Sequence, residues 1–322
     1  MNTKIKLNYP AMICLFVAFL CLQGCTEFEE EFDSSTAKNI FESYSQIGVK
    51  HNEGLEGFFN DVKNLHTVRI KSGNKVNLNK TDYQSLAKQS VIDFCAKNEN
   101  FNTSAQLCEE SLNNAWKKPL TKSNDAILRN SDIKELLEEL ETVIAKGGGD
   151  KNLTDFQRDL EVINQKAKNS LSETDAVAIY AATSTAFSSY QYWKENHVKW
   201  MVALNCPELL ALYSDDELNR FSIKNGNLVA PGTVRLKSWW DDAWGAVGEA
   251  WDTGSAFMTS WWDNGGSDVV GADAGGAAWG AMAGAMAGLT TAGTLSGPAA
   301  IAGGITGGCG ASIQETIEQW IR

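Results

Sequence analysis

The sequence predicts a mainly α-helical protein, and three observations lead to that prediction. Apolar residues recur at helical spacing through residues 39–215, a strand-like pattern is confined to residues 221–229, and a glycine- and alanine-rich stretch follows. We expect a helical domain over 39–215, a linker over 216–235 and a tryptophan-rich, glycine-zipper region over 236–322. The linker contains Asn225-Gly226, which suits the two-residue turn of a short β-hairpin.

Within the helical domain, the pattern is clearest over residues 132–145 and 155–167. The first of these stretches is followed by three consecutive glycines, which terminate helices. Ser172 is expected to cap a longer helix, because an acidic residue stands three positions further on, as in a capping box. Thr81 is the expected cap of a helix over residues 83–96.

The region after residue 273 has an unusual glycine pattern. Residues 274–314 contain no charged side chain, and residues 294–298 predict a turn that divides the stretch in two. Glycines recur at four-residue spacing on both sides of this turn: Gly276, Gly280, Gly284 and Gly288 before it, and Gly304 and Gly308 after it. Each glycine inside a helix costs about 1 kcal/mol relative to alanine, whereas a stripe of glycines lets two backbones approach closely. We predict a helical hairpin, called the glycine-zipper hairpin below.

Three environments suit the glycine-zipper hairpin. It can be the buried core of a helical domain, it can insert into or lie on a bilayer, or it can pair with partner helices or with a second copy in a homo-oligomer. Each predicted helix is mostly glycine and alanine, so its hydrophobicity is marginal for a membrane span. The sequence leaves these three alternatives open.

Tryptophans are concentrated just before the glycine-zipper hairpin. Seven fall within residues 239–279: Trp239, Trp240, Trp244, Trp251, Trp261, Trp262 and Trp279. On a helix, Trp240, Trp244 and Trp251 share one face. An apolar ring with a polar N–H suits a membrane or protein interface, and it suits a core equally well.

The N-terminal residues have the layout of a secretory signal over 1–24. Lys4 and Lys6 precede an apolar run over 11–22, which is too short to span a bilayer. The run ends in Leu22-Gln23-Gly24-Cys25, which resembles the lipobox of bacterial lipoproteins. The resemblance implies cleavage before Cys25, acylation of that cysteine (palmitate among its acyl chains) and an outer-membrane lipoprotein of the cell envelope. Acyl chains would then be the contact with the membrane.

Residues 25–38 form an acidic tether. It is either a plain spacer or, as it also resembles, a surface-export signal of Bacteroidota lipoproteins. Further on, Ile47-Gly48-Val49-Lys50-His51-Asn52-Glu53-Gly54-Leu55 resembles an "IGxxHNxGL" segment of uncharacterised Bacteroidota lipoproteins, and Ser189-Tyr190-Gln191-Tyr192-Trp193 resembles a second such segment. That family implies no activity.

Net charge and cysteine content limit the partners and the disulfides that we expect for this protein. The net charge of −12 disfavours nucleic acid as a partner. Once the signal is removed and Cys25 is acylated, four cysteines remain: Cys95, Cys108, Cys206 and Cys309. Cys95 and Cys108 are close in sequence and are the first candidate for a disulfide, which would add about 3 kcal/mol. The three connectivities that four cysteines allow stay open.

Motifs of known chemistry are absent from the sequence: it contains no HExxH, GxSxG, GxxxxGK[ST] or CxxC. We therefore predict a protein that is not an enzyme and has no cofactor or metal site, and we expect His51 to be structural.

The glycine-zipper hairpin is similar to the glycine zippers of bacteriocins, which are usually cationic. Residues 235–322, however, hold three basic and nine acidic side chains. The function we predict is a non-enzymatic cell-envelope lipoprotein whose hairpin associates with membrane or partner helices in a bacteriocin-like manner. The alternative is a structural or ligand-binding helical lipoprotein in which the hairpin is buried core.

Overall fold

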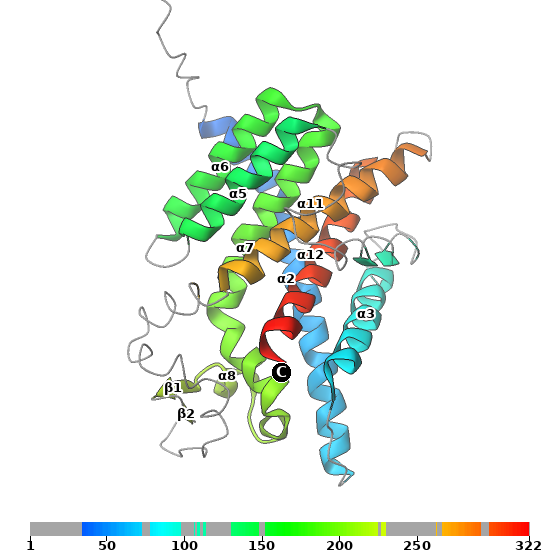
Figure 1. Ribbon diagram of the computed structural model, residues 1–322, viewed down its shortest axis with the longest axis vertical. Coiled ribbons are helices and arrows are strands. Elements are labelled where there is room, and N and C mark those ends of the chain that lie inside the picture. Colours follow the sequence, from blue (N-terminus) through cyan, green and yellow to red (C-terminus); the bar gives the residue numbers. More distant parts are fainter. Residues whose placement is uncertain are drawn as a thin grey trace, which may run out of the picture. The chain divides into compact units, whose positions relative to one another are not determined.

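A computed structural model describes most of the chain beyond residue 33 (Figure 1). The described residues are 34–72, 78–97, 106, 108, 109, 112, 113, 130–147, 152–224, 227–229, 262, 266–290 and 296–321. Residues from Ser34 onward belong to one compact unit. The signal peptide, Cys25 and most of the acidic tether lie outside the described residues.

The described residues are mainly helical, which confirms the predicted fold class. The principal helices are α2 (Ser34–Lys71), α3 (Lys80–Lys97), α5 (Ser131–Gly147), α6 (Leu153–Ser170), α7 (Glu173–Asn205), α11 (Ser267–Thr290) and α12 (Ser296–Trp320). Shorter elements follow α7: the 3₁₀ helix η3 (Pro207–Ala211), α8 (Asp215–Leu218), β1 (Ser222–Lys224) and β2 (Asn227–Val229). Helix α2 begins at Ser34, so it includes the last five residues assigned to the tether.

Helical patterns in the sequence locate α5 and α6 well. The apolar stripe of α5 is buried, and the helix ends at Gly147, the first of the three glycines. A side chain at Gly147 would lie 2.6 Å from the Phe156 ring of α6, so this glycine also allows the two helices to pack closely. Ser172 caps α7 as predicted, since its hydroxyl accepts a hydrogen bond from the Asp175 N–H at 3.2 Å.

The predicted cap of α3 is wrong. The helix begins at Lys80, and the capping residue is Asn79 rather than Thr81. The Asn79 side chain accepts a hydrogen bond from the Asp82 N–H, and the Asp82 carboxylate accepts one from the Asn79 N–H, each at 3.0 Å. This reciprocal pair satisfies two backbone donors, whereas a single hydroxyl would satisfy one.

The predicted β-hairpin is present as strands β1 and β2. They pair antiparallel, with Ser222 opposite Val229, Ile223 opposite Leu228 and Lys224 opposite Asn227. The expected turn at residues 225–226 lies outside the described residues.

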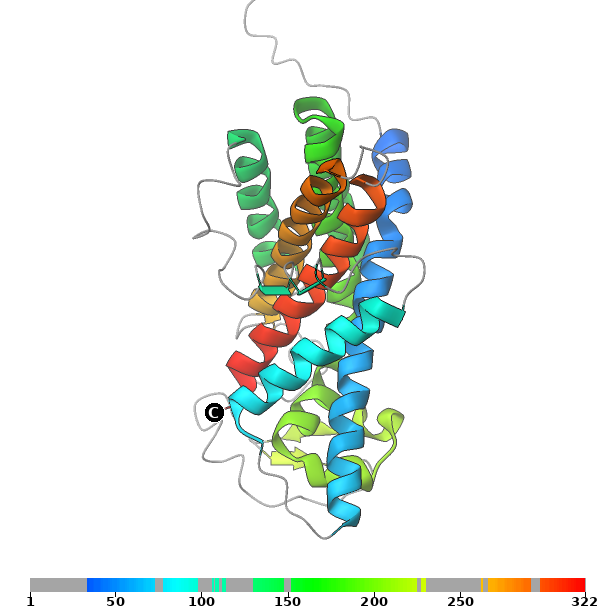
Figure 2. The same cartoon turned by 90° about the vertical axis from the view of Figure 1, so that its right-hand side faces the viewer.

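Helices α11 and α12 form the predicted glycine-zipper hairpin, and other helices of the chain cover it. Helix α12 contacts α2, α3 and α7 as well as α11, while α11 also contacts α7 and α5. In Figure 2, α12 (red) lies between α11 (orange) and the pair α2 and α3 (blue and cyan). Helix α6 packs on α7, α5 and α2. This arrangement makes α2 and α7 the supports of the hairpin.

Candidate functional site

The two helices of the glycine-zipper hairpin meet through bare backbone. A Cβ atom placed on Gly276 would collide with the carbonyl oxygen of Gly307, and one on Gly280 with the carbonyl oxygen of Gly303. Gly284 approaches the carbonyl group of Ala299 in the same way. Since real Cβ atoms essentially never come within 3.0 Å of such groups, this seam requires glycine.

The later glycines of the predicted stripe, Gly304 and Gly308, lie on a second seam. A side chain at Gly304 would lie 3.4 Å from Ala181 of α7. One at Gly308 would lie 3.0 Å from the His51 ring of α2 and 3.4 Å from Thr185 of α7. The α12 residues that face α11 most closely are therefore Gly303 and Gly307, one position earlier than the spacing indicated. Gly304 and Gly308 pack against the supporting helices and also against α11, where added Cβ atoms would lie 3.3 Å from the Ala277 and 3.2 Å from the Asp273 carbonyl oxygen.

The glycine positions predicted as a membrane or partner interface thus lie inside the fold. Gly276, Gly280, Gly284, Gly304 and Gly308 are all buried against this chain's own helices. Gly288 belongs to α11, but its packing lies outside the described part of the chain. Among the helices that the structure describes, none is long and apolar enough to cross a membrane.

One carboxyl group is buried beside this second seam. Asp273 of α11 is fully buried, and its Oδ2 accepts hydrogen bonds from the Ser189 hydroxyl and from the Trp193 indole N–H at 3.2 Å. Burial raises the pKa of Asp273 to about 7, while the hydrogen bonds from Ser189, Ser312 and Trp193 act in the opposite direction. We call Asp273, Ser189, Trp193, His51 and Asn52 the Asp273 junction.

His51 completes the junction from α2, and its neighbours define its tautomer. The Asn52 side-chain amide donates to the Ser188 carbonyl oxygen at 3.0 Å, which directs the Asn52 carbonyl oxygen toward His51 Nδ1, also at 3.0 Å. His51 Nδ1 is therefore the protonated nitrogen, and Nε2 faces Asp273 Oδ2 at 3.7 Å. Burial lowers the pKa of His51 to about 4, so this ring is neutral at pH 7.

The two sequence segments 47–55 and 189–193 meet at this junction. In the first, Gly48 packs against Ser188 of α7 and donates its N–H to the Ser184 hydroxyl at 3.3 Å. Gly54 faces the Cys309 thiol of α12, where a Cβ would lie 2.6 Å from the sulfur. The second segment supplies Ser189 and Trp193. These small and polar residues mark the crossing of α2, α7 and the hairpin.

The Asp273 junction contains a serine, a histidine and a carboxyl group, but their connections differ from those of a nucleophilic triad. The Ser189 hydroxyl donates to Asp273 and not to His51, so the serine–histidine hydrogen bond of such a triad is not formed. All three side chains are 0% exposed, and no substrate reaches them in this conformation. What the arrangement does is fasten α11 to α7 and α2.

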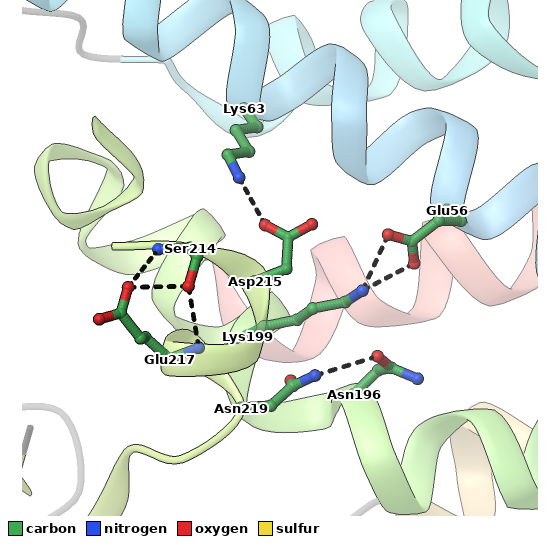
Figure 3. Close-up of polar contacts among 8 residues, drawn as sticks. All are labelled: Glu56, Lys63, Asn196, Lys199, Ser214, Asp215, Glu217 and Asn219. Atoms are coloured by element: carbon green, nitrogen blue, oxygen red, sulfur yellow. Dashed lines mark hydrogen bonds and ion pairs between the residues drawn. The ribbon is translucent and has the colours of Figure 1, made fainter. Parts of the chain in front are cut away.

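A second polar cluster lies between α2, α7 and α8 (Figure 3). The Lys199 ammonium group donates to both Glu56 carboxylate oxygens, at 2.9 and 2.7 Å, and lies 4.5 Å from the centre of the Phe59 ring. Its side chain is only 5% exposed, whereas that of Glu56 is 35% exposed. Tyr192 donates to Glu56 at 3.0 Å and accepts from Trp200 at 2.8 Å. The buried ammonium group is therefore fully paired.

The remaining contacts of Figure 3 attach the short helix α8. Lys63 of α2 pairs with Asp215, and Asn219 donates to Asn196 of α7 at 3.5 Å. Ser214 and Glu217 form a capping box at the start of α8. These contacts position the segment after α7.

The two cysteines of the predicted disulfide lie together. Cys95 and Cys108 are buried and are not joined by a disulfide in this structure, and hydrogen bonding with Cys108 is the main cause that raises the pKa of the Cys95 thiol. The Cys95 sulfur also lies 3.0 Å from the Thr306 hydroxyl of α12, and the Cys309 thiol donates to the His51 carbonyl oxygen at 3.2 Å. The disulfide itself remains a prediction.

Other predicted site residues lie outside the described residues: Cys25, Trp240, Trp244 and Trp251. Of the later tryptophans, Trp262 and Trp279 are buried. The Trp262 ring meets Tyr190 edge-on with centroids 5.2 Å apart, and its N–H donates to the Ala145 carbonyl oxygen at 3.3 Å. At these two tryptophans, the structure shows burial in the core.

Sequence reasoning did not single out Asp273, Glu56 or Lys199. For Asp273 a signal existed, because it is the carboxylate that directly precedes the charge-free stretch, and a helix that packs on all sides must bury it with partners. Glu56 and Lys199 are 143 positions apart, and no local pattern relates them.

No group of histidine, cysteine, aspartate and glutamate side chains suited to a metal ion occurs among the residues that the structure describes. No family model, no curated protein and no solved structure matches the chain. The geometry of the chain itself is therefore the basis for any functional conclusion.

Proposed function

We propose that this protein is a non-enzymatic, lipid-anchored protein of the bacterial cell envelope, in which the glycine-zipper hairpin is the buried spine of a helical body. The anchor is Cys25, attached to the outer membrane through its acyl chains. The body that follows acts as a structural or ligand-binding module held at the membrane surface, and it takes no part in binding nucleic acid.

The observation that supports this proposal is the packing of the hairpin. Its first seam is occupied by its own two backbones and its second by α2 and α7. The Asp273 junction adds hydrogen bonds from α7 to α11. A helix face already in contact with neighbours at van der Waals distance is not available to lipid or to a partner.

Acylation is tested directly by growing cells with labelled palmitate. Wild-type protein should carry the label and fractionate with the outer membrane, and the Cys25→Ser variant should do neither. An unlabelled wild-type protein would refute the anchor.

The charge-free stretch within the hairpin also supports a second candidate function. Residues 274–314 carry no charge, so a hairpin released from its supports would meet little electrostatic resistance at a bilayer or between partner helices. In this bacteriocin-like alternative the described fold is a storage form.

Vesicle flotation and size measurement of the Cys25→Ser form separate the two candidates. As a buried spine, the hairpin keeps the protein monomeric and leaves it at the bottom of the gradient with vesicles of phosphatidylethanolamine and phosphatidylglycerol. Flotation, or an oligomer abolished by Gly280→Ile without loss of helicity, would favour the second candidate.

A further inference from the structure

Two thiols from different segments meet on the surface of α12. Cys95 lies in the last turn of α3, and Cys108 lies in the segment that follows it, where residues 108 and 109 are helical. Each side chain is 2% exposed, and the two thiols share a hydrogen bond. The Thr306 hydroxyl of α12 contacts the Cys95 sulfur at 3.0 Å, so Cys95 is held against the glycine-zipper hairpin.

The other two cysteines are engaged elsewhere. The Cys309 thiol donates to the His51 carbonyl oxygen and packs against Gly54. Both residues belong to α2, so the Cys309 side chain faces that helix. Cys206 is the C-cap of α7. A thiol that hydrogen-bonds another thiol is already close to the separation that a disulfide requires, which distinguishes the pair 95–108 from the other connectivities.

We propose that Cys95 and Cys108 form a disulfide that covalently joins the last turn of α3 to the helical residues 108 and 109. The inference rests on the proposed envelope location only for its oxidant, a dithiol–disulfide exchange protein or a small disulfide. Because both sulfurs are buried in the folded protein, the bond forms during folding.

The chemistry balances as two successive exchanges. The Cys95 thiolate attacks the oxidant's disulfide, forms a mixed disulfide and releases one oxidant thiolate. The Cys108 thiolate then attacks the Cys95 sulfur, which forms the internal bond and releases the second oxidant thiolate. The protein loses two protons and two electrons, and the oxidant is reduced to two thiols.

The bond is detected in a tryptic map of the full-length protein isolated from the cell envelope after blocking free thiols with iodoacetamide. Cleavage places Cys95 in peptide 89–97 and Cys108 in peptide 98–117. These two peptides should appear as one linked mass and separate on reduction, with Cys206 and Cys309 alkylated. Alkylated Cys95 and Cys108 in the unreduced map, or Cys95 joined to peptide 238–322 through Cys309, would overturn the proposal.

A functional readout uses urea unfolding with and without reductant. Reduction should raise the unfolding equilibrium constant of the wild-type protein about 100-fold, because a loop of this length is freed. Cys206→Ser, a buried cysteine outside the pair, should show the same response, and Cys95→Ser and Cys108→Ser should show none. A wild-type protein whose unfolding equilibrium constant does not change with reductant would contradict the disulfide.

Failure of the anchor and failure of the disulfide are distinguishable. If the protein is not acylated, refolding it in a glutathione redox buffer still tests the pair, since glutathione disulfide supplies the oxidant. Envelope-located protein with four free thiols would refute the disulfide and leave the proposed function untouched.

Discussion

The most informative perturbation is Asp273→Asn. In the folded protein burial raises the pKa of Asp273 to about 7, against 3.8 for the exposed side chain. A raised folded-state pKa means that the stability contribution is complete below pH 3.8 and is lost as the pH rises toward 7. Asparagine has nearly the same shape, keeps an oxygen to accept from Ser189 and Trp193, and does not ionise.

The magnitude follows from linkage. Between pH 5 and pH 8 the wild-type protein should lose about 3 kcal/mol of unfolding free energy through this one group, and the asparagine variant should not. The difference in unfolding free energy between variant and wild type should therefore shift by about 3 kcal/mol in favour of the variant over that interval. His66 and His197 cancel in this comparison because both proteins contain them, whereas His51 lies 3.7 Å from Asp273 and titrates together with it.

The assay is urea unfolding of Cys25→Ser forms at the two pH values, followed by circular dichroism. Asp268→Asn, on an exposed turn of the same helix, controls for the change in net charge. A difference that stays constant from pH 5 to pH 8 would refute the reasoning. A shift in favour of wild type at pH 8 would mean that hydrogen bonds from Ser189 and Trp193 keep the carboxylate charged.

Three further predictions concern packing and charge. Gly280→Ala should destabilise the protein by about 1–3 kcal/mol, because the new methyl group meets the Gly303 backbone. Gly271→Ala on the same helix faces open space and should stabilise the protein by up to about 1 kcal/mol. Equal urea midpoints for the two variants would contradict the close packing at Gly280. Burial lowers the pKa of His51 and His197 to about 4. Each histidine should therefore lower the unfolding free energy by about 2 kcal/mol as the pH falls from 6.5 to 5. An Asp273→Asn form with the same urea midpoint at pH 7 and pH 5 would refute this. Glu56→Ala should cost about 1–3 kcal/mol because it leaves the buried Lys199 unpaired, and Lys199→Met should partly restore stability in the double variant; a larger loss in the double variant would contradict it.

Helical periodicity was sufficient to predict α5, α6 and the start of α7, because each has a continuous apolar stripe and a local cap. Thr81 failed as a cap because several polar residues near a helix start compete, and the reciprocal bonds of Asn79 and Asp82 decide between them. The glycine spacing predicted a helical hairpin, but not that Gly303 and Gly307 form the closest seam, since Gly304 and Gly308 have the same spacing.

The surroundings of the hairpin could not be read from local patterns. A glycine stripe has the same sequence whether it faces a backbone in a core, a lipid or another protein. The environment of the stripe is determined by contacts with residues far away in the chain, such as those of Thr185 and His51 with Gly308. Similarly, Ser189 and Asp273 are 84 positions apart, so only tertiary packing reveals that they share a hydrogen bond.

Hydrogen exchange of the lipidated protein, with and without vesicles of outer-membrane composition, tests the central claim most directly. If the glycine-zipper hairpin is an internal spine, amides in residues 274–285 and 300–317 should exchange as slowly as the most protected amides of α7, and vesicles should not change their rates. Rapid exchange in those two segments, or protection that changes when vesicles are added, would contradict the account.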